Sequence, residues 1–254
     1  MRVMQHLLVR GLFSVWDIRV KDETLSTNDD AAALARSGAP SRTVCVARRQ
    51  TGGRGRFDRV WFSPADKGLY CSVILRPSVP AESFGLLSFC AALAMADTVR
   101  AGIKWPNDII MNGRKICGIL SSWGYDRHGN SFAVIGSGLN IFSGSCPPGL
   151  EEKAACLEDF GMAEPQDVIL SRYLPLLDST VQELESHGFT GIRCRLEERC
   201  VMIGKPVLVS GGQQAEGIAE GIGDQGELLV RQPSGGLVSV TCGDVSVRGV
   251  NGYV

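Results

Sequence analysis

Short apolar runs separated by turn residues recur along the first half of the chain. Runs of this length, with alternating or continuous apolar residues, are typical of β-strands. The dipeptide Asn112-Gly113 predicts a tight β-hairpin between two such runs, and Pro106 predicts a bend before it. We therefore expect an antiparallel meander that ends in Gly136-Ser137-Gly138-Leu139-Asn140. The predicted strands cover residues 15–20, 43–47, 68–75, 103–111, 114–120 and 132–135.

Apolar positions at helical spacing predict helices between and after these strands. One helix starts at Ser26-Thr27-Asn28 and ends at Gly38 and Pro40. The side chain of Ser26 or Thr27 can cap its free N–H groups, which explains these polar residues without any ligand. Further helices are expected over 80–100, closed by Gly102, over 150–160, over 165–188 with a bend or break at Pro175, and over 192–202.

From Gly204 onward, four short apolar strands and glycine-rich turns predict a small β barrel. We therefore expect an α+β protein in which a mixed, largely antiparallel sheet packs with helices. The predicted domains are residues 1–203 and residues 204–254.

Composition narrows the class of protein. The 254 residues carry a formal net charge of -1, so a broad basic face for nucleic acid or anionic membrane is not expected. Nine cysteines without a C-x-x-C pair argue against a disulfide framework or a structural zinc site, and most are predicted to be small buried hydrophobes. Arg10 and Asp17 interrupt the apolar start of the chain, so neither a signal peptide nor a membrane span is expected, and a cytoplasmic location is predicted.

Positive charge is concentrated in one stretch, residues 48–61, which holds five arginines and three glycines. Glycines let backbone N–H groups approach an anion, and arginines offer forked donors, so phosphate or carboxylate binding is predicted. The stretch is neither a Walker A loop nor a G-x-G-x-x-G turn. A solvated flexible loop and an RNA contact remain alternatives.

Two further residue types leave alternatives open. Period-two alternation places Lys115 on one strand face with Cys117 and Ile119, and its amine either extends to water or points into a pocket. Trp61 and Trp105 either stack on a planar ring or belong to the core. The three histidines show no metal-ligand or triad spacing.

Read together, these pieces resemble the biotin protein ligase family from about Trp16 to about Arg248. The Lys104-Trp105-Pro106-Asn107-Asp108 and Gly53-Arg54-Gly55-Arg56 motifs carry most of the specificity. The other matching segments are Asp22-Glu23-Thr24, Ser26-Thr27-Asn28, Gln50-Thr51-Gly52, Trp61-Phe62-Ser63-Pro64, Arg114-Lys115-Ile116-Cys117-Gly118-Ile119-Leu120 and Gly136-Ser137-Gly138-Leu139-Asn140.

The resemblance implies a class II synthetase-like catalytic domain, an SH3-like barrel and two chemical steps. Biotin and ATP, with Mg²⁺, give biotinyl-5'-AMP, and a lysine of a biotin carboxyl carrier protein or domain then takes the biotin. The implied catalytic residues are Lys115, Arg56 and Asp108; biotin would meet Ser26, Thr27, Asn28, Gln50, Gly53, Arg54 and Gly118; ATP and the adenylate would meet Arg56, Arg59, Trp61, Lys115 and Asn140.

The sequence departs from the family pattern in two places. Asp58 stands where the family loop often has its last glycine, while Arg59 and Trp61 stay in register. Fewer than twenty residues precede the first matching strand, so a short form without the N-terminal DNA-binding domain, and no binding to DNA or membrane, is expected. A homodimer is possible. A lipoate protein ligase is the alternative enzyme, and a biotin-sensing DNA-binding regulator is the alternative class.

Overall fold

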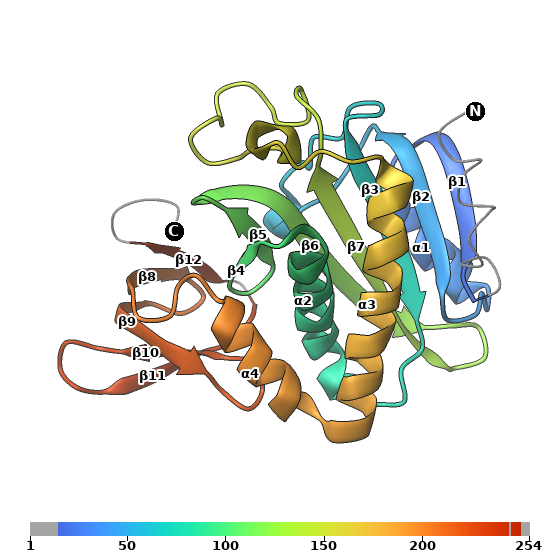
Figure 1. Ribbon diagram of the computed structural model, residues 1–254. Coiled ribbons are helices and arrows are strands. Elements are labelled where there is room, and N and C mark those ends of the chain that lie inside the picture. The colour runs from blue at the N-terminus through green and yellow to red at the C-terminus, as the bar shows by residue number, and fades with distance from the viewer. Residues whose placement is uncertain (1–14, 244, 250–254) are drawn as a thin grey trace.

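The protein is described by a computed structural model for residues 15–243 and 245–249 (Figure 1). Its centre is a seven-stranded sheet in the order β1-β2-β3-β7-β6-β5-β4. β1 and β2 run parallel and the other neighbouring pairs are antiparallel, which confirms the mixed, largely antiparallel sheet. The strands are β1 Asp17–Thr24, β2 Thr43–Gln50, β3 Gly68–Leu75, β4 Gly102–Lys104, β5 Asp108–Met111, β6 Arg114–Tyr125 and β7 Ser131–Asn140.

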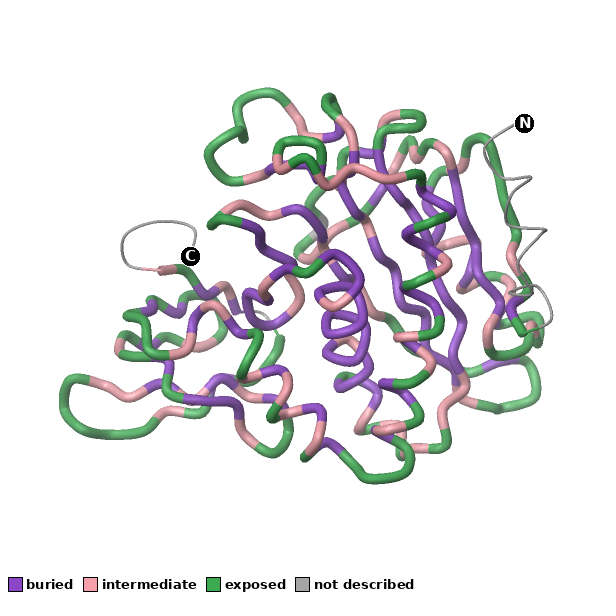
Figure 2. The backbone as a smooth tube through the Cα atoms, viewed as in Figure 1, coloured by how far each residue is buried: buried purple, intermediate pink, exposed green. Residues whose placement is uncertain are grey.

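Helices cover both faces of this sheet (Figure 1). α1 (Thr27–Arg36) lies on one face, and α2 (Leu87–Val99) and α3 (Gln166–His187) pack on the other. Alternation along β2 serves both layers, since Val44 and Val46 join the core under α2 and α3 while Cys45 joins the smaller core under α1. Figure 2 shows the buried backbone concentrated in the strands and in α2.

The predicted helices differ from the observed ones in detail. The segment after Pro80 begins as a 3₁₀ helix, Ala81–Leu86, before α2, and Arg100 in the left-handed conformation closes it two residues before Gly102. α3 continues through Pro175 without a break. The helix expected over 150–160 shrinks to a 3₁₀ turn, Leu157–Phe160, and α4 spans Phe189–Arg199.

One helical stretch passes the length and composition test for a membrane span. It covers Ala81–Val99, and 72% of its 18-residue window is buried inside the protein. The contacts of α2 with the sheet and with α3 explain its apolar surface as core.

The C-terminal part forms a second, antiparallel sheet in the order β11-β10-β9-β8-β12. This unit confirms the predicted C-terminal β fold, although the predicted strands stop before β12. Residues 1–14 and 250–254 of the two predicted domains lie outside the described residues. The strands are β8 Pro206–Gly211, β9 Ala215–Ile222, β10 Leu228–Arg231, β11 Leu237–Val240 and β12 Val245–Gly249.

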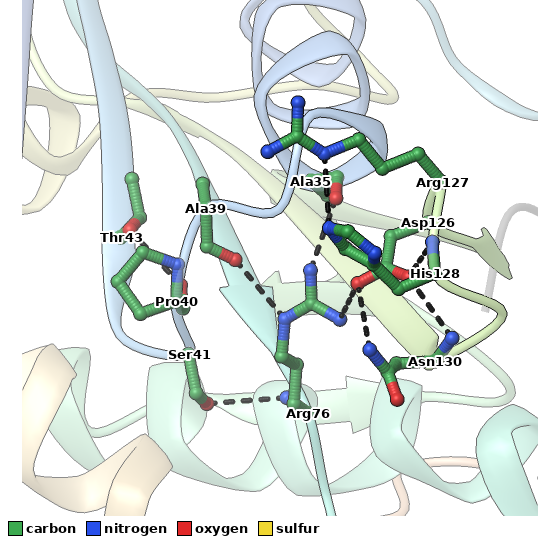
Figure 3. Close-up of polar contacts among 10 residues, drawn as sticks. All are labelled: Ala35, Ala39, Pro40, Ser41, Thr43, Arg76, Asp126, Arg127, His128 and Asn130. Atoms are coloured by element: carbon green, nitrogen blue, oxygen red, sulfur yellow. Dashed lines mark hydrogen bonds and ion pairs between the residues drawn. The ribbon is translucent and has the colours of Figure 1, made fainter.

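A polar cluster ties the C-terminal end of α1 to the sheet (Figure 3). The guanidinium of Arg76 donates to the carbonyls of Ala35 and Ala39, each at 3.0 Å, and to the Asp126 carboxylate at 3.0 Å. Asp126 also accepts the backbone N–H groups of His128 and Asn130 at 2.9 Å. Because helix C-terminal carbonyls need partners, this cluster fixes the position of α1, whose other end faces the site described next.

Candidate active site

A pocket lies where the N-terminal end of α1, the 50–62 loop, strands β4 to β7 and strand β12 meet. Its lining includes seven basic residues and a single carboxylate, that of Asp108. In a chain with a net charge of -1, this concentration of positive charge favours an anionic ligand. The seven basic residues are Arg54, Arg56, Arg59, Lys104, Lys115, Lys153 and Arg248.

The start of α1 forms one end of the pocket, and its capping differs from the prediction. Ser26 occupies the N-cap position, but its side chain makes no capping hydrogen bond. The amide oxygen of Gln50 instead accepts from the Thr27 N–H at 2.8 Å and from the Thr27 hydroxyl at 3.1 Å. The nitrogen of the same amide donates to Ser63 Oγ at 2.9 Å. Capping by Ser26 was therefore the wrong interpretation, and its hydroxyl faces the pocket lining instead.

Asn28 lies beside this cap over a glycine. Its Oδ1 is 2.5 Å from Ser72 Oγ, which also lies 2.8 Å from Thr27 Oγ1. The Asn28 amide lies so close to Gly136 that a β-carbon at residue 136 would overlap it. Thus β3 and β7 together set the rotamer of a polar side chain at the pocket end.

The basic stretch does not present all of its charge to the pocket. Arg48 pairs with Asp66 at 2.6 Å, Arg49 pairs with Glu23 at 2.7 Å, and Arg54 pairs with Asp29. The expectation of one uniformly anion-seeking stretch is therefore wrong, because carboxylates from β1, α1 and a turn neutralise three of its five arginines.

The 50–62 loop folds back on itself through backbone hydrogen bonds, in contrast to the open solvated loop that remained an alternative. Gln50 N–H donates to the Ser63 carbonyl at 3.1 Å and Trp61 N–H donates to the Gly53 carbonyl at 2.8 Å. Phe57 takes the left-handed conformation with φ 58 at the loop tip. The side chain of Asp58 lies outside the described part of the chain.

Arg56 links this loop to the C-terminal sheet. Its guanidinium donates to Asn107 Oδ1 at 3.3 Å, to the Val245 carbonyl at 3.3 Å and to the Gly243 carbonyl. Strand β12 thereby becomes a wall of the pocket, with Val245, Ser246, Val247 and Arg248 in the lining. Arg59 lies nearby, with its guanidinium 5.5 Å from the centre of the Phe57 ring.

Lys115 points into the pocket, where its Nζ lies 2.5 Å from Asp108 Oδ1 and 5.1 Å from the centre of the Trp61 ring. A register shift between β5 and β6 pairs Ile109 with Cys117 but Ile110 with Lys115, so Ile116 is the extra residue of a β-bulge. The bulge reverses the expected face: Lys115 lies beside Gly118, not with Cys117 and Ile119. The alternation prediction was wrong at this position because period two fails across a bulge.

Glycines form the floor under Lys115 and Trp61. A β-carbon at Gly118 would stand 3.2 Å from both Lys115 Nζ and the Trp61 ring, and one at Gly138 would overlap the Trp61 indole nitrogen. That nitrogen and the Asn140 Oδ1 are buried without a hydrogen-bond partner among the described residues. Buried polar groups normally have partners, so both atoms are free to meet a ligand. Trp105 instead belongs to the core, with its indole nitrogen donating to the Gly226 carbonyl at 2.9 Å.

Of the thirteen residues that the resemblance implied, twelve line the pocket and Gly53 does not. A β-carbon at Gly53 would press on the Trp61 carbonyl and stand 2.8 Å from Ser63 Oγ, so this glycine permits loop closure. The prediction missed Lys104 and Asn107, although both lie in a quoted motif, and it missed β12, which no motif announces. The twelve are Ser26, Thr27, Asn28, Gln50, Arg54, Arg56, Arg59, Trp61, Asp108, Lys115, Gly118 and Asn140.

The cysteines and metal-binding groups agree with the composition. All nine cysteines are free thiols, and six of them are buried. Across residues 15–243 and 245–249, no group of three or more His, Cys, Asp or Glu side chains could hold a metal ion.

Comparisons with known proteins cover most of the chain. The description "Biotin/lipoate A/B protein ligase family" matches residues 21–140, and "Biotin protein ligase C terminal domain" matches residues 202–248. A biotin--[acetyl-CoA-carboxylase] ligase of Mycobacterium tuberculosis is 36% identical over 250 residues, covering 92% of this chain and 91% of that protein. One of Paracoccus denitrificans is 34% identical over 225 residues, covering 84% and 93%. A solved biotin protein ligase from Aquifex aeolicus in complex with biotin and ATP has a TM-score of 0.78 at 23% identity, over 92% of this chain and 99% of that one.

Proposed function

The chain belongs to the biotin protein ligase family, and we propose that its pocket carries out ATP-dependent, AMP-forming ligation of biotin to a carrier lysine with the residues assigned below. The observation that carries the assignment is the Lys115 and Asp108 pair over a glycine floor, in a lining of seven basic residues and one carboxylate. Such a lining suits a reaction in which every substrate and leaving group is an anion.

In the first step, a biotin carboxylate oxygen attacks the α-phosphorus of ATP, the bond to the β-phosphate oxygen breaks, and pyrophosphate leaves. Lys115 is the donor assigned to the charge that develops between carboxylate and phosphate, with Arg56 and Arg59 beside it. Positioned donors of this kind commonly lower a barrier by about 3 kcal/mol each. The short reach of Lys115 over Gly118 supports this role, since a side chain at residue 118 would displace the amine.

Biotin is assigned to the end of the pocket formed by α1 and the loop. Ser26, Thr27, Asn28 and Gln50 supply hydroxyl and amide groups there, and the Gln50 amide is held in place by Thr27 and Ser63. Arg54 is assigned to the same end, with Gly53 and Gly118 providing backbone that a ligand can approach. The adenine end is assigned to Trp61 and Asn140, whose unpartnered polar atoms support the assignment.

In the second step, a lysine amine of the carrier attacks the carbonyl carbon of the adenylate, the bond to the phosphate oxygen breaks, and AMP leaves. Asp108 is assigned beside the incoming amine, because it is the carboxylate of the lining and lies at the strand end next to Lys115. A mixed anhydride hydrolyses in water, so the folded 50–62 loop and its link to β12 would shield it.

Mg²⁺ is expected to arrive with ATP. The lining offers one carboxylate, which already pairs with Lys115, and Mg²⁺ commonly binds through substrate phosphates with one or two carboxylates. The ion would then neutralise phosphate charge alongside the basic residues.

We further propose residues 1–203 as the catalytic domain and 204–254 as the β domain, a biotin carrier protein or domain as partner, and a cytoplasmic location. A homodimer stays a prediction. The lipoate alternative falls within the wider family description, but the match to a biotin protein ligase C-terminal domain over 202–248 favours biotin.

Incubating the protein with ATP, Mg²⁺, radiolabelled biotin and an unmodified carrier domain tests the proposal. We expect label on the carrier, none when the carrier lysine is replaced, and none without ATP. An unlabelled carrier that accepts lipoate in the same assay would overturn biotin specificity.

A further inference from the structure

Lys104 is the deepest basic residue of the pocket. It is 4% exposed, and it is the one lysine or arginine among the described residues that is classed with the buried polar groups. By comparison, the Lys115 side chain is 24% exposed. A buried ammonium needs a compensating charge, so its neighbours decide what it does.

The sheet places a carboxylate next to it. Lys104 and Asp108 are direct partners in the antiparallel pairing of β4 and β5, so their side chains leave the same face of the sheet. Asp108 is in turn paired with Gly118 of β6, over which Lys115 reaches to meet Asp108 at 2.5 Å. One carboxylate therefore lies between two lysines, a deep one on β4 and a more accessible one on β6.

We propose that Lys104 is a positioning residue of the proposed ligase: it keeps Asp108 an oriented anion when Lys115 turns from Asp108 to the substrates. This inference rests on the proposed function, because it assigns a reason for Lys115 to move. With one cation, a partly buried carboxylate would hold Lys115 tightly, since removing a partner strands a charge. With two cations, Asp108 retains a partner and Lys115 is released for the developing phosphate charge.

The titration of Lys104 gives this role a signature. Burial lowers the pKa of Lys104 to about 8; Asp108 on β5 opposes the shift, while Lys115 on β6, Arg248 on β12 and Arg59 in the loop add to it. The ammonium is present below this pKa and lost above it, so adenylate formation should weaken as pH rises through 8. Arginine at this position would stay charged over the whole range.

Biotin-dependent exchange of pyrophosphate into ATP isolates the first step and involves no carrier amine. We would measure it from pH 6.5 to 10 for the wild type, Lys104→Arg, Lys104→Met and Lys205→Arg, with melting temperatures for all four. Lys205 is an exposed lysine outside the pocket lining, so Lys205→Arg makes the same chemical exchange at a neutral place.

We expect the wild-type and Lys205→Arg rates to fall with an apparent pKa near 8, by roughly tenfold for each pH unit above it. Lys104→Arg should move that decline upward by about one pH unit or more, and Lys104→Met should exchange at least about tenfold more slowly at pH 7.5 without a decline near 8. If the arginine variant loses its fold, the methionine variant carries the test.

A Lys104→Arg enzyme with the wild-type decline, or a Lys104→Met enzyme with the wild-type rate, would overturn the positioning role. A wild-type protein that neither exchanges pyrophosphate nor labels a carrier would instead overturn the proposed function. The two failures are therefore distinguishable.

Discussion

The indole nitrogen of Trp61 lies directly against the backbone of Gly138, in space that a β-carbon at residue 138 would fill. Trp61 comes from the basic loop and Gly138 from the centre of β7, so this contact seats the loop on the sheet. Lys115 completes the stack, with its ammonium 5.1 Å from the centre of the Trp61 ring. The position of the loop is thus set by a missing side chain.

Gly138→Ala should push Trp61 out of its seat and weaken ATP binding. Overpacking of this kind costs about 1–3 kcal/mol, which would raise the KM for ATP by roughly tenfold. Steady-state exchange kinetics and tryptophan fluorescence on ATP addition would measure it. Gly85→Ala is the matched control, because a β-carbon there meets nothing within 4 Å, and an equal effect in both variants would contradict the seating role.

Lys115→Ala should abolish adenylate formation while the fold persists. The loss of one positioned donor commonly costs about 10²–10³ in rate. Pyrophosphate exchange is the measurement, and thermal unfolding checks the fold. Lys67→Ala, at an exposed lysine outside the lining, should match the wild type. Near wild-type exchange by Lys115→Ala would refute the assigned role.

Arg56→Gly should release the adenylate and biotinylate bystander lysines. The change removes the donor to Asn107 and to the carbonyls of Gly243 and Val245, so the loop loses its attachment to β12. A lost hydrogen bond to a charged group is commonly worth about 1.5–3 kcal/mol, so adenylate dissociation should rise roughly tenfold or more.

Labelled bystander protein, measured with and without the carrier, reports this release. Arg49→Gly is the control within the same stretch, because Arg49 pairs with Glu23 at the sheet edge and does not line the pocket. An Arg56→Gly enzyme that is as selective as the wild type would argue against the loop attachment.

Asp126 should make the protein less stable in acid. Its burial alone would raise the pKa of Asp126, but hydrogen bonds from Asn130 and His128 and the charge of Arg76 outweigh burial and lower this pKa to about 2. A carboxylate in solution has a pKa of about 3.9, so its stabilising contribution is fully present above that value and is lost as pH falls towards 2.

Urea unfolding of the wild type and Asp126→Asn from pH 7 to pH 2 tests this pH dependence. We expect the variant to be less stable at pH 7 and the gap to close in acid. Asp224→Asn, at a surface pair whose carboxylate side chain is 87% exposed, should show little of either effect. A gap that does not change with pH would contradict the assigned ionisation.

Local patterns predicted most elements of the sheet. The Asn112-Gly113 turn takes positive φ at both residues, as the hairpin signal requires, and Pro106 lies in the bend between β4 and β5. Motif matching also located most of the pocket lining. These successes share a cause, because turns and motifs depend on residues that are close in the sequence.

The failures depend on residues that are distant in the sequence. A bulge at Ile116 reversed the face of Lys115, and the cap of α1 came from Gln50 on β2. The ion pairs of Arg49 and Arg54 depend on how β1 and α1 lie beside the loop. Neither period nor propensity records such tertiary contacts.

The attachment of Arg56 to β12 also affects when the site comes into being. Val245 follows Arg56 by 189 residues, so a ribosome must translate most of the protein before the loop can find its last partner. A nascent chain that has folded only its large sheet would have biotin-side groups but an open pocket wall. Premature activation of biotin, with loss of the adenylate to nearby lysines, is thereby deferred until synthesis is almost complete.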